Sequence, residues 1–152
     1  MIYTGIGSRA TPTDVLHIMT KIAQGLAKTD DAILRSGGAK GADSAFEDGA
    51  DKKEIYLPWK GFNNNDSPLF DITNEAYEIA KHYHPAWNRC SPAARKFHAR
   101  NCYQILGKDL DTPTDLVICW TPDGKISGGT GQALRIALDY NININNLYEA
   151  TQ

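Results

Sequence analysis

Three predicted strands of this chain each end in a glycine-containing turn that leads into a predicted helix. The strands cover residues 2–6, 32–34 and 116–120, and the turns contain the glycines of 5–7, 37–41 and 128–131. In an open parallel sheet, ligands bind outside the carboxyl ends of the strands, where helix N-termini offer free N–H groups and partial positive charge. Glycine also lets the backbone approach an anion closely. We therefore expect the three turns to form one pocket for a phosphate-bearing ligand.

Strands and helices alternate along the whole sequence. Two further strands are predicted at 54–57 and 144–148, and helices at 42–50, 72–83, 92–106 and 132–138. Another helix follows the first turn, with Thr11 as its expected N-cap and an apolar face that includes Val15, Met19 and Leu26. This alternation predicts an α/β fold, a three-layer Rossmann-like parallel sheet with helices on both faces. Residues 1–152 are expected to form a single domain.

Composition excludes several classes of protein. Hydrophobic residues make up 41% of the chain and charged residues 22%, as is usual for a soluble globular protein. The net charge of -2 means that nonspecific nucleic-acid binding would need a local basic patch. The sequence predicts no signal peptide, and no apolar run approaches the ~18 residues of a membrane span, so no membrane partner is expected.

The three cysteines do not indicate a disulfide framework. Cys90, Cys102 and Cys119 are odd in number and are not closely spaced, which favours a reducing, cytoplasmic location. None lies in a CxxC pair, so we expect no metal site built on them.

The first turn is a variant of the dinucleotide-binding fingerprint. Gly5-Ile-Gly-Ser-Arg-Ala10 follows the pattern G-x-G-x-x-A, but the second strand ends in Arg35-Ser36-Gly37 instead of the acidic residue that would hold a ribose. The sequence also lacks the GxxxxGK[ST] pattern of a Walker A loop. These features disfavour dinucleotide-dehydrogenase chemistry, and no resident cofactor is expected.

Residues 81–101 contain no acidic side chain. They include the cations Lys81, Arg89, Arg95, Lys96 and Arg100 and the histidines His82, His84 and His98. Arginine binds phosphate through two hydrogen bonds and Trp87 can stack on a base, so the segment predicts an anion-facing wall. The alternative is a solvated helix face with a structural tryptophan. No carboxylate or cysteine accompanies the histidines at ligand spacing, so a metal site is not expected here.

Three segments, in the same order along the chain, resemble the SLOG superfamily. Residues 36–43 (SGGAKGAD) look like its SGGAxGxD segment, 97–101 (FHARN) resemble its arginine segment, and 127–131 (SGGTG) look like its PGGxGTxxE segment. The superfamily includes the Rossmann-like domain of DNA-processing protein A (DprA) and the LOG phosphoribohydrolases. The resemblance implies a nucleotide phosphate on the glycine turns and places Arg100 at the family's catalytic arginine.

The chain departs from the LOG pattern at three positions. Arg135 stands where the LOG enzymes have a glutamate needed to cleave the N-glycosidic bond, and Ser127 and Gln132 replace the motif's proline and second threonine. These departures imply that hydrolysis by the usual LOG mechanism is not favoured.

The candidate ligand-binding residues come from the three turns, the arginine segment and the end of the fourth strand: Gly7, Ser8, Arg9, Ser36, Gly37, Gly38, Ala39, Gly41, Asp43, Arg100, Asn101, Trp120, Gly128, Gly129, Thr130 and Gly131. Asp43 is expected either to bind a ribose hydroxyl or to stabilise the start of its own helix. Trp120 is expected either to stack on a base or to pack in the core. If the chain is an enzyme, its catalytic candidates are Arg100, Asp43 and Glu47.

The leading hypothesis is a protein that binds a nucleotide-derived small molecule, either to sense it or to sequester it. One alternative is an N-glycosidic-bond hydrolase that acts on nucleotides. Another is DprA-like binding of single-stranded DNA through the basic segment. A homo-oligomer is also expected, because proteins of the resembled superfamily often pair through helices on the sheet.

Overall fold

The computed structural model describes residues 1–151 and has a five-stranded parallel sheet at its centre. The strands are β1 (Ile2–Gly5), β2 (Ile33–Ser36), β3 (Lys52–Ile55), β4 (Leu116–Cys119) and β5 (Asn143–Asn146). Their order is β3-β2-β1-β4-β5, and every neighbouring pair is parallel. In such a sheet the connections after β1 and β4 leave toward opposite faces, which opens a crevice at the carboxyl ends of these two strands.

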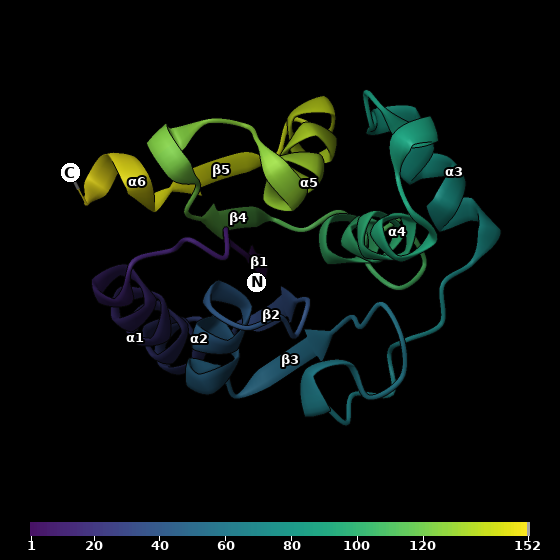
Figure 1. Ribbon diagram of the computed structural model, residues 1–152. Helices are drawn as coiled ribbons and strands as arrows, with labels where there is room; N and C mark the ends of the chain where they lie inside the picture. The colour runs from purple at the N-terminus through teal and green to yellow at the C-terminus, as the bar shows by residue number, and fades with distance from the viewer. Residues whose placement is uncertain (152) are drawn as a thin grey trace.

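Helices cover both faces of the sheet (Figure 1). One layer contains α1 (Thr13–Thr29) and α2 (Ala42–Gly49), and the other contains α4 (Pro92–Leu106) and α5 (Gly128–Asp139), with α3 (Asn74–Tyr83) packed on α4. The chain ends in the short helix α6 (Leu147–Ala150). Three 3₁₀ turns lie between these elements: η1 (Phe62–Asn64), η2 (Trp87–Arg89) and η3 (Pro122–Gly124). The expected three-layer Rossmann-like fold is confirmed.

The central strands are buried on both faces, which explains their apolar sequences. Tyr3, Leu34 and Ile118 pack against α1 and α2, whereas Val117 and Cys119 pack against α4 and α5. The edge strands are more polar and more exposed, with sequences KKEI in β3 and NINN in β5. The hydrophobic core therefore lies on both faces of β2, β1 and β4.

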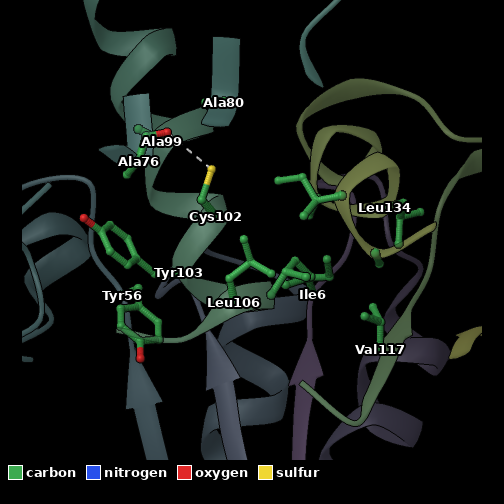
Figure 2. Close-up of a cluster of buried hydrophobic side chains, with 14 of the residues drawn as sticks. Ile6, Tyr56, Ala76, Ala80, Ala99, Cys102, Tyr103, Leu106, Val117 and Leu134 are labelled. Atoms are coloured by element: carbon green, nitrogen blue, oxygen red, sulfur yellow. Dashed lines mark hydrogen bonds between the residues drawn. The ribbon is translucent and has the colours of Figure 1, made fainter. Parts of the chain in front are cut away.

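A buried cluster fixes α4 on the sheet (Figure 2). Leu106 and Ile6 lie close together in it, and Tyr103 stacks on Tyr56 with 5.6 Å between ring centroids. On the outer side of α4, the Cys102 thiol donates to the Ala76 carbonyl of α3 at 3.5 Å. Because α4 is anchored from both sides, its polar residues are held in place at the end of the sheet.

Several element boundaries differ from those expected. The N-cap of α1 is Pro12, and the Thr11 hydroxyl instead donates to the Ser8 carbonyl within the turn, so the predicted Thr11 cap is wrong. Helix α5 begins at Gly128, which makes the glycine turn the first turn of the helix. The last strand stops at Asn146, because that side chain accepts from the Tyr148 N–H and caps α6.

All three cysteines are free thiols. Among the described residues, no helix combines the length and apolar character that crossing a bilayer requires.

Candidate functional site

A cavity of about 480 Å³ lies at the carboxyl ends of β1, β2 and β4. Its walls come from the turns after these strands, from one side of α4 and from the first turn of α5: Ile6, Gly7, Ser8, Arg9, Ala39, Lys40, Asp43, Phe97, Arg100, Asn101, Gln104, Pro122, Ser127, Gly128, Gly129, Thr130 and Ala133. Its volume falls within the roughly 300–1,000 Å³ of small-molecule sites. The structure therefore brings the three glycine turns together around one space.

A second hollow of about 390 Å³ shares part of this wall. Arg9, Ala39 and Lys40 line both spaces, and the second hollow adds Gly41, Phe62 and Asn63. The two hollows therefore adjoin each other along Arg9, Ala39 and Lys40.

Two consecutive residues of α4 hold the glycine turns on either side of the cavity. The Arg100 guanidinium donates to the carbonyls of Gly37 and Tyr56, the latter at 3.0 Å. The Asn101 amide donates to the Gly129 carbonyl at 3.1 Å, and its oxygen accepts from Arg100 Nε at 2.9 Å. These bonds fix the turn after β2 and the start of α5 relative to each other.

Arg100 is a buried cation, and its hydrogen-bond acceptors among the described residues are all neutral. Its side chain forms none of the ion pairs found among the described residues, and Nη2 is left without a hydrogen-bond partner there. Burial lowers the pKa of Arg100 to about 10, against the opposing effect of Asp43, so the group stays charged at neutral pH. Its guanidinium carbon lies 5.5 Å from the Phe97 ring centroid and 5.8 Å from that of Phe62.

Asp43 is the one carboxylate in the cavity wall. Its Oδ2 accepts from the Ala39 N–H at 3.2 Å, which ties it to the turn that precedes its own helix. Burial raises the pKa of Asp43, although Arg100 acts in the opposite direction. The observed bond fits the expected role at the start of α2, and the position in the wall also leaves the carboxyl within reach of a ligand.

Arg9 and Lys40 add two exposed positive charges at the border between the two hollows. Neither forms an ion pair or a side-chain hydrogen bond with the described residues. With Arg100, they give the cavity wall three cations against the single carboxylate of Asp43. The electrostatics of the site therefore favour an anion.

Some predicted site residues build the turns and do not line the main cavity. The buried Ser36 hydroxyl donates to the Gly5 carbonyl at 2.6 Å. Gly37 has no space for a side chain, because a Cβ there would lie 2.7 Å from Arg100 Nη1 and 2.8 Å from Asp43 Oδ2. Gly38 has a φ of +71°, and its Cβ would lie 2.7 Å from Leu57. Gly131 packs on the backbone of Ile126.

Two predicted residues lie away from the cavity. Trp120 is only 8% exposed and belongs to the core cluster with Leu147, so its ring is not available to stack on a base. Its carbonyl instead accepts from the Ser8 N–H at 3.1 Å. Glu47 binds Lys53 at 2.9 Å and Asn65 at 3.0 Å and is absent from both hollows. These contacts explain why Glu47 is not assembled with Asp43 as a carboxylate pair.

Most of the basic segment does not face the cavity. Of its cations, Arg100 alone is in the cavity wall, while Arg95 donates to the Trp87 carbonyl and lies over the Trp87 ring at 5.0 Å. Burial lowers the pKa of His84, and lowers that of His98 to about 4, so these rings are neutral at pH 7. The expectation that the basic segment forms an anion-facing wall is wrong for most of its cations, because the other charges of the cavity come from Arg9 and Lys40.

Sequence reasoning placed Trp59 near the edge of the site as a possible partner for a base, but it missed the two phenylalanines beside it. Phe97 lines the main cavity and Phe62 the second hollow, and Trp59 packs on both rings at 5.3 Å between centroids. Phe97 lies in the arginine segment, but nothing in the sequence spacing predicts that Phe62 and Trp59 pack on it. The link comes from the long connection between β3 and α3.

No metal site is expected at the histidines, because no cysteine or carboxylate accompanies them at ligand spacing in the sequence, but the fold brings a cysteine to two of them. Cys90 lies beside His84 and His98 in the structure, although the spacing of these three residues along the chain matches no metal-binding motif. Arg135, at the position of the LOG glutamate, points to the end of α3, where its Nε donates to the Tyr83 carbonyl at 3.0 Å.

The chain matches no protein-family model, and no curated protein matches its sequence significantly. A similar fold is found in DNA processing protein A from Helicobacter pylori, whose structure is described under the words "unique single-stranded DNA binding mode". The TM-score is 0.61 at 20% sequence identity, over 95% of this chain and 63% of the DprA chain. The chain thus spans less than two thirds of that protein, and the likeness shows a DprA-like fold.

Proposed function

We propose that this chain binds single-stranded DNA, with the backbone phosphates in the cavity and unpaired bases against the neighbouring aromatic rings. The observation that carries this proposal is the arrangement of Arg9, Lys40 and Arg100 around the glycine turns, three cations that form no ion pair within residues 1–151. The exposed N–H groups at the start of α5 add partial positive charge on the opposite side.

The second hollow supports a polynucleotide over a single nucleotide. It continues from the main cavity past Arg9 and Lys40 to Phe62, so a strand that follows both hollows would pass cations and then an aromatic ring. Trp59, 40% exposed, extends this aromatic surface. Stacking of unpaired bases on aromatic rings beside a cationic groove is the usual mode of single-strand binding.

The likeness in fold to a DNA-binding protein also supports the proposal. DNA processing protein A has a similar fold, and the description of its structure names single-stranded DNA binding. Membership of the SLOG superfamily is part of the same proposal, since its three characteristic segments surround the cavity here.

The experiment is a titration of a fluorescein-labelled oligo(dT) strand followed by anisotropy at several salt concentrations, with a duplex of equal length beside it. Each phosphate contact on a single strand contributes about 0.7 to the slope of log K against log salt. We expect a slope of about 2 for three contacts, and weaker binding with a slope lower by about 0.7 in Arg9→Ala or Lys40→Ala. The exposed Lys21 of α1 is the matched control, because Lys21→Ala removes the same kind of charge at a residue that lines neither hollow.

Equal affinity for duplex and single strand would contradict the proposal, as would equal effects of Lys40→Ala and Lys21→Ala.

A small-nucleotide ligand is the second candidate, because the main cavity alone has the size of a small-molecule site. Competition by a nucleoside monophosphate at concentrations similar to the oligonucleotide would favour it. Chromatography of the same mixtures for free base tests the hydrolase alternative, which has less support because Arg135 and Glu47 are turned to other partners.

A further inference from the structure

We propose that His84, Cys90 and His98 bind a divalent transition metal ion of the Zn²⁺ type. One ligand atom from each residue lies within 4.8 Å of the others. The Cys90 sulfur is 3.7 Å from His84 Nε2 and 3.9 Å from Nδ1, and the two imidazole centroids are 4.5 Å apart. Ligand atoms around a tetrahedral zinc are about 3.5 Å apart, so small side-chain movements would complete the site.

The three ligands are held by three different elements. His84 is the C-cap of α3, Cys90 is the C-cap of η2, and His98 lies within α4. Arg95 of α4 fixes η2 by donating to the Trp87 carbonyl at 3.0 Å. The cluster therefore exists before any ion arrives, which limits the ordering that binding requires.

His98 provides an independent sign of a missing partner. Its Nδ1 is buried and has no hydrogen-bond partner among the described residues. Buried polar atoms in folded proteins are nearly always bonded, and an orphan of this kind requires an explanation. A metal ion in the cluster would take the lone pair of this imidazole.

Two features oppose binding and have to be overcome. The Ala86 N–H donates to His84 Nδ1 at 3.0 Å, and this bond must yield when the ring ligates an ion. The positive charge of Arg135 also acts on both imidazoles and opposes the binding of a cation between them. Cys90 offsets that repulsion, because it ligates as a thiolate and releases its proton to solvent.

The donor set selects the class of ion. Two imidazoles and one thiolate suit Zn²⁺ and its spectroscopic substitute Co²⁺, whereas Mg²⁺ and Ca²⁺ prefer oxygen ligands that this cluster lacks. Three protein ligands leave a fourth position for water. None of the three residues lines the proposed DNA cavity, so the metal site stands or falls separately from the proposed function. A bound ion would cross-link residues 84–90 to α4, the helix that carries Arg100 and Asn101.

The test is a Co²⁺ titration of the full, reduced chain, followed by optical spectroscopy. We expect one equivalent to bind with a sulfur-to-cobalt charge-transfer band and the visible bands of tetrahedral cobalt, and Zn²⁺ to displace it. Cys90→Ser should abolish the charge-transfer band, and His98→Asn should weaken binding at least tenfold. His82→Asn is the control, since His82 is exposed in the same segment and lies outside the cluster. Circular dichroism of each variant confirms that it is folded.

A second readout is thermal unfolding with Zn²⁺. An ion that binds the folded state and not the unfolded state raises the melting temperature. This rise should disappear in Cys90→Ser and persist in His82→Asn. The proposal is overturned if the wild-type chain gives no thiolate–cobalt band, or if Cys90→Ser keeps both the band and the zinc-dependent rise.

Discussion

Gly38 and Gly129 both belong to the glycine turns, but a side chain would have different effects at the two positions. Gly38 has positive φ, and a Cβ there would meet Leu57, so substitution strains the backbone and the core beneath it. Gly129 lies in the first turn of α5, where a Cβ meets no atom within 4 Å. The sequence predicts both as ligand-binding glycines. The sequence does not reveal that Gly38 is required by the turn whereas Gly129 lines the cavity, because these roles depend on the residues that pack against each glycine.

Asp43 allows a pH test at the residue scale. Burial raises the pKa of Asp43 in the folded chain above its value in the unfolded chain. The folded state is therefore destabilised relative to the unfolded state as pH rises through the folded-state pKa. Asp43→Asn removes this destabilisation. The unfolding free energy of the variant relative to wild type should therefore increase as pH rises above about 4, the ordinary pKa of an unfolded aspartate, in urea titrations. The opposite trend would mean that Arg100 holds Asp43 as a stabilising ion pair.

At the scale of elements, the sequence predicts the strand–helix alternation well, because buried parallel strands and amphipathic helices have clear apolar patterns. The differences occur where local capping decides the boundary. Asn146 ends β5 by capping α6, and Thr11 binds the Ser8 carbonyl, leaving the cap to Pro12. Trp120 follows a strand at the predicted edge of the site, but its ring turns into the core beside Tyr148. Such rotations depend on tertiary packing, which hydrophobic periodicity does not report.

Helix α4 supplies a prediction about how one element organises the site. Asn101→Ala removes the bond to the Gly129 carbonyl and leaves the buried Arg100 Nε without its acceptor. A buried group without a partner costs about 1–3 kcal/mol. We expect that loss in chemical denaturation, together with weaker oligonucleotide binding because α5 is no longer tied to α4. Loss of stability with unchanged oligonucleotide affinity would show that the bond between Asn101 and Gly129 is not needed for binding.

At the scale of the whole molecule, the net charge of -2 conceals a local excess of cations at one end of the sheet. The acid-free segment 81–101 indicates that charge is unevenly distributed, but the cavity takes only Arg100 from it. Arg9 and Lys40 arrive from the turns after β1 and β2, which the strand order places beside α4. That order is a long-range property, which local sequence patterns do not predict. The homo-oligomer and the cytoplasmic location stay predictions.

The central claim is that the glycine turns and α4 enclose one anion site, and Gly129→Val tests it most directly. The matched control is Gly25→Val, also a helical glycine with open space around its Cβ, but on α1 and away from the cavity. Oligo(dT) affinity and thermal stability should be measured on the same samples. We predict that Gly129→Val loses at least tenfold in affinity while melting as a folded domain, and that Gly25→Val keeps wild-type affinity. Wild-type affinity in folded Gly129→Val would contradict the claim.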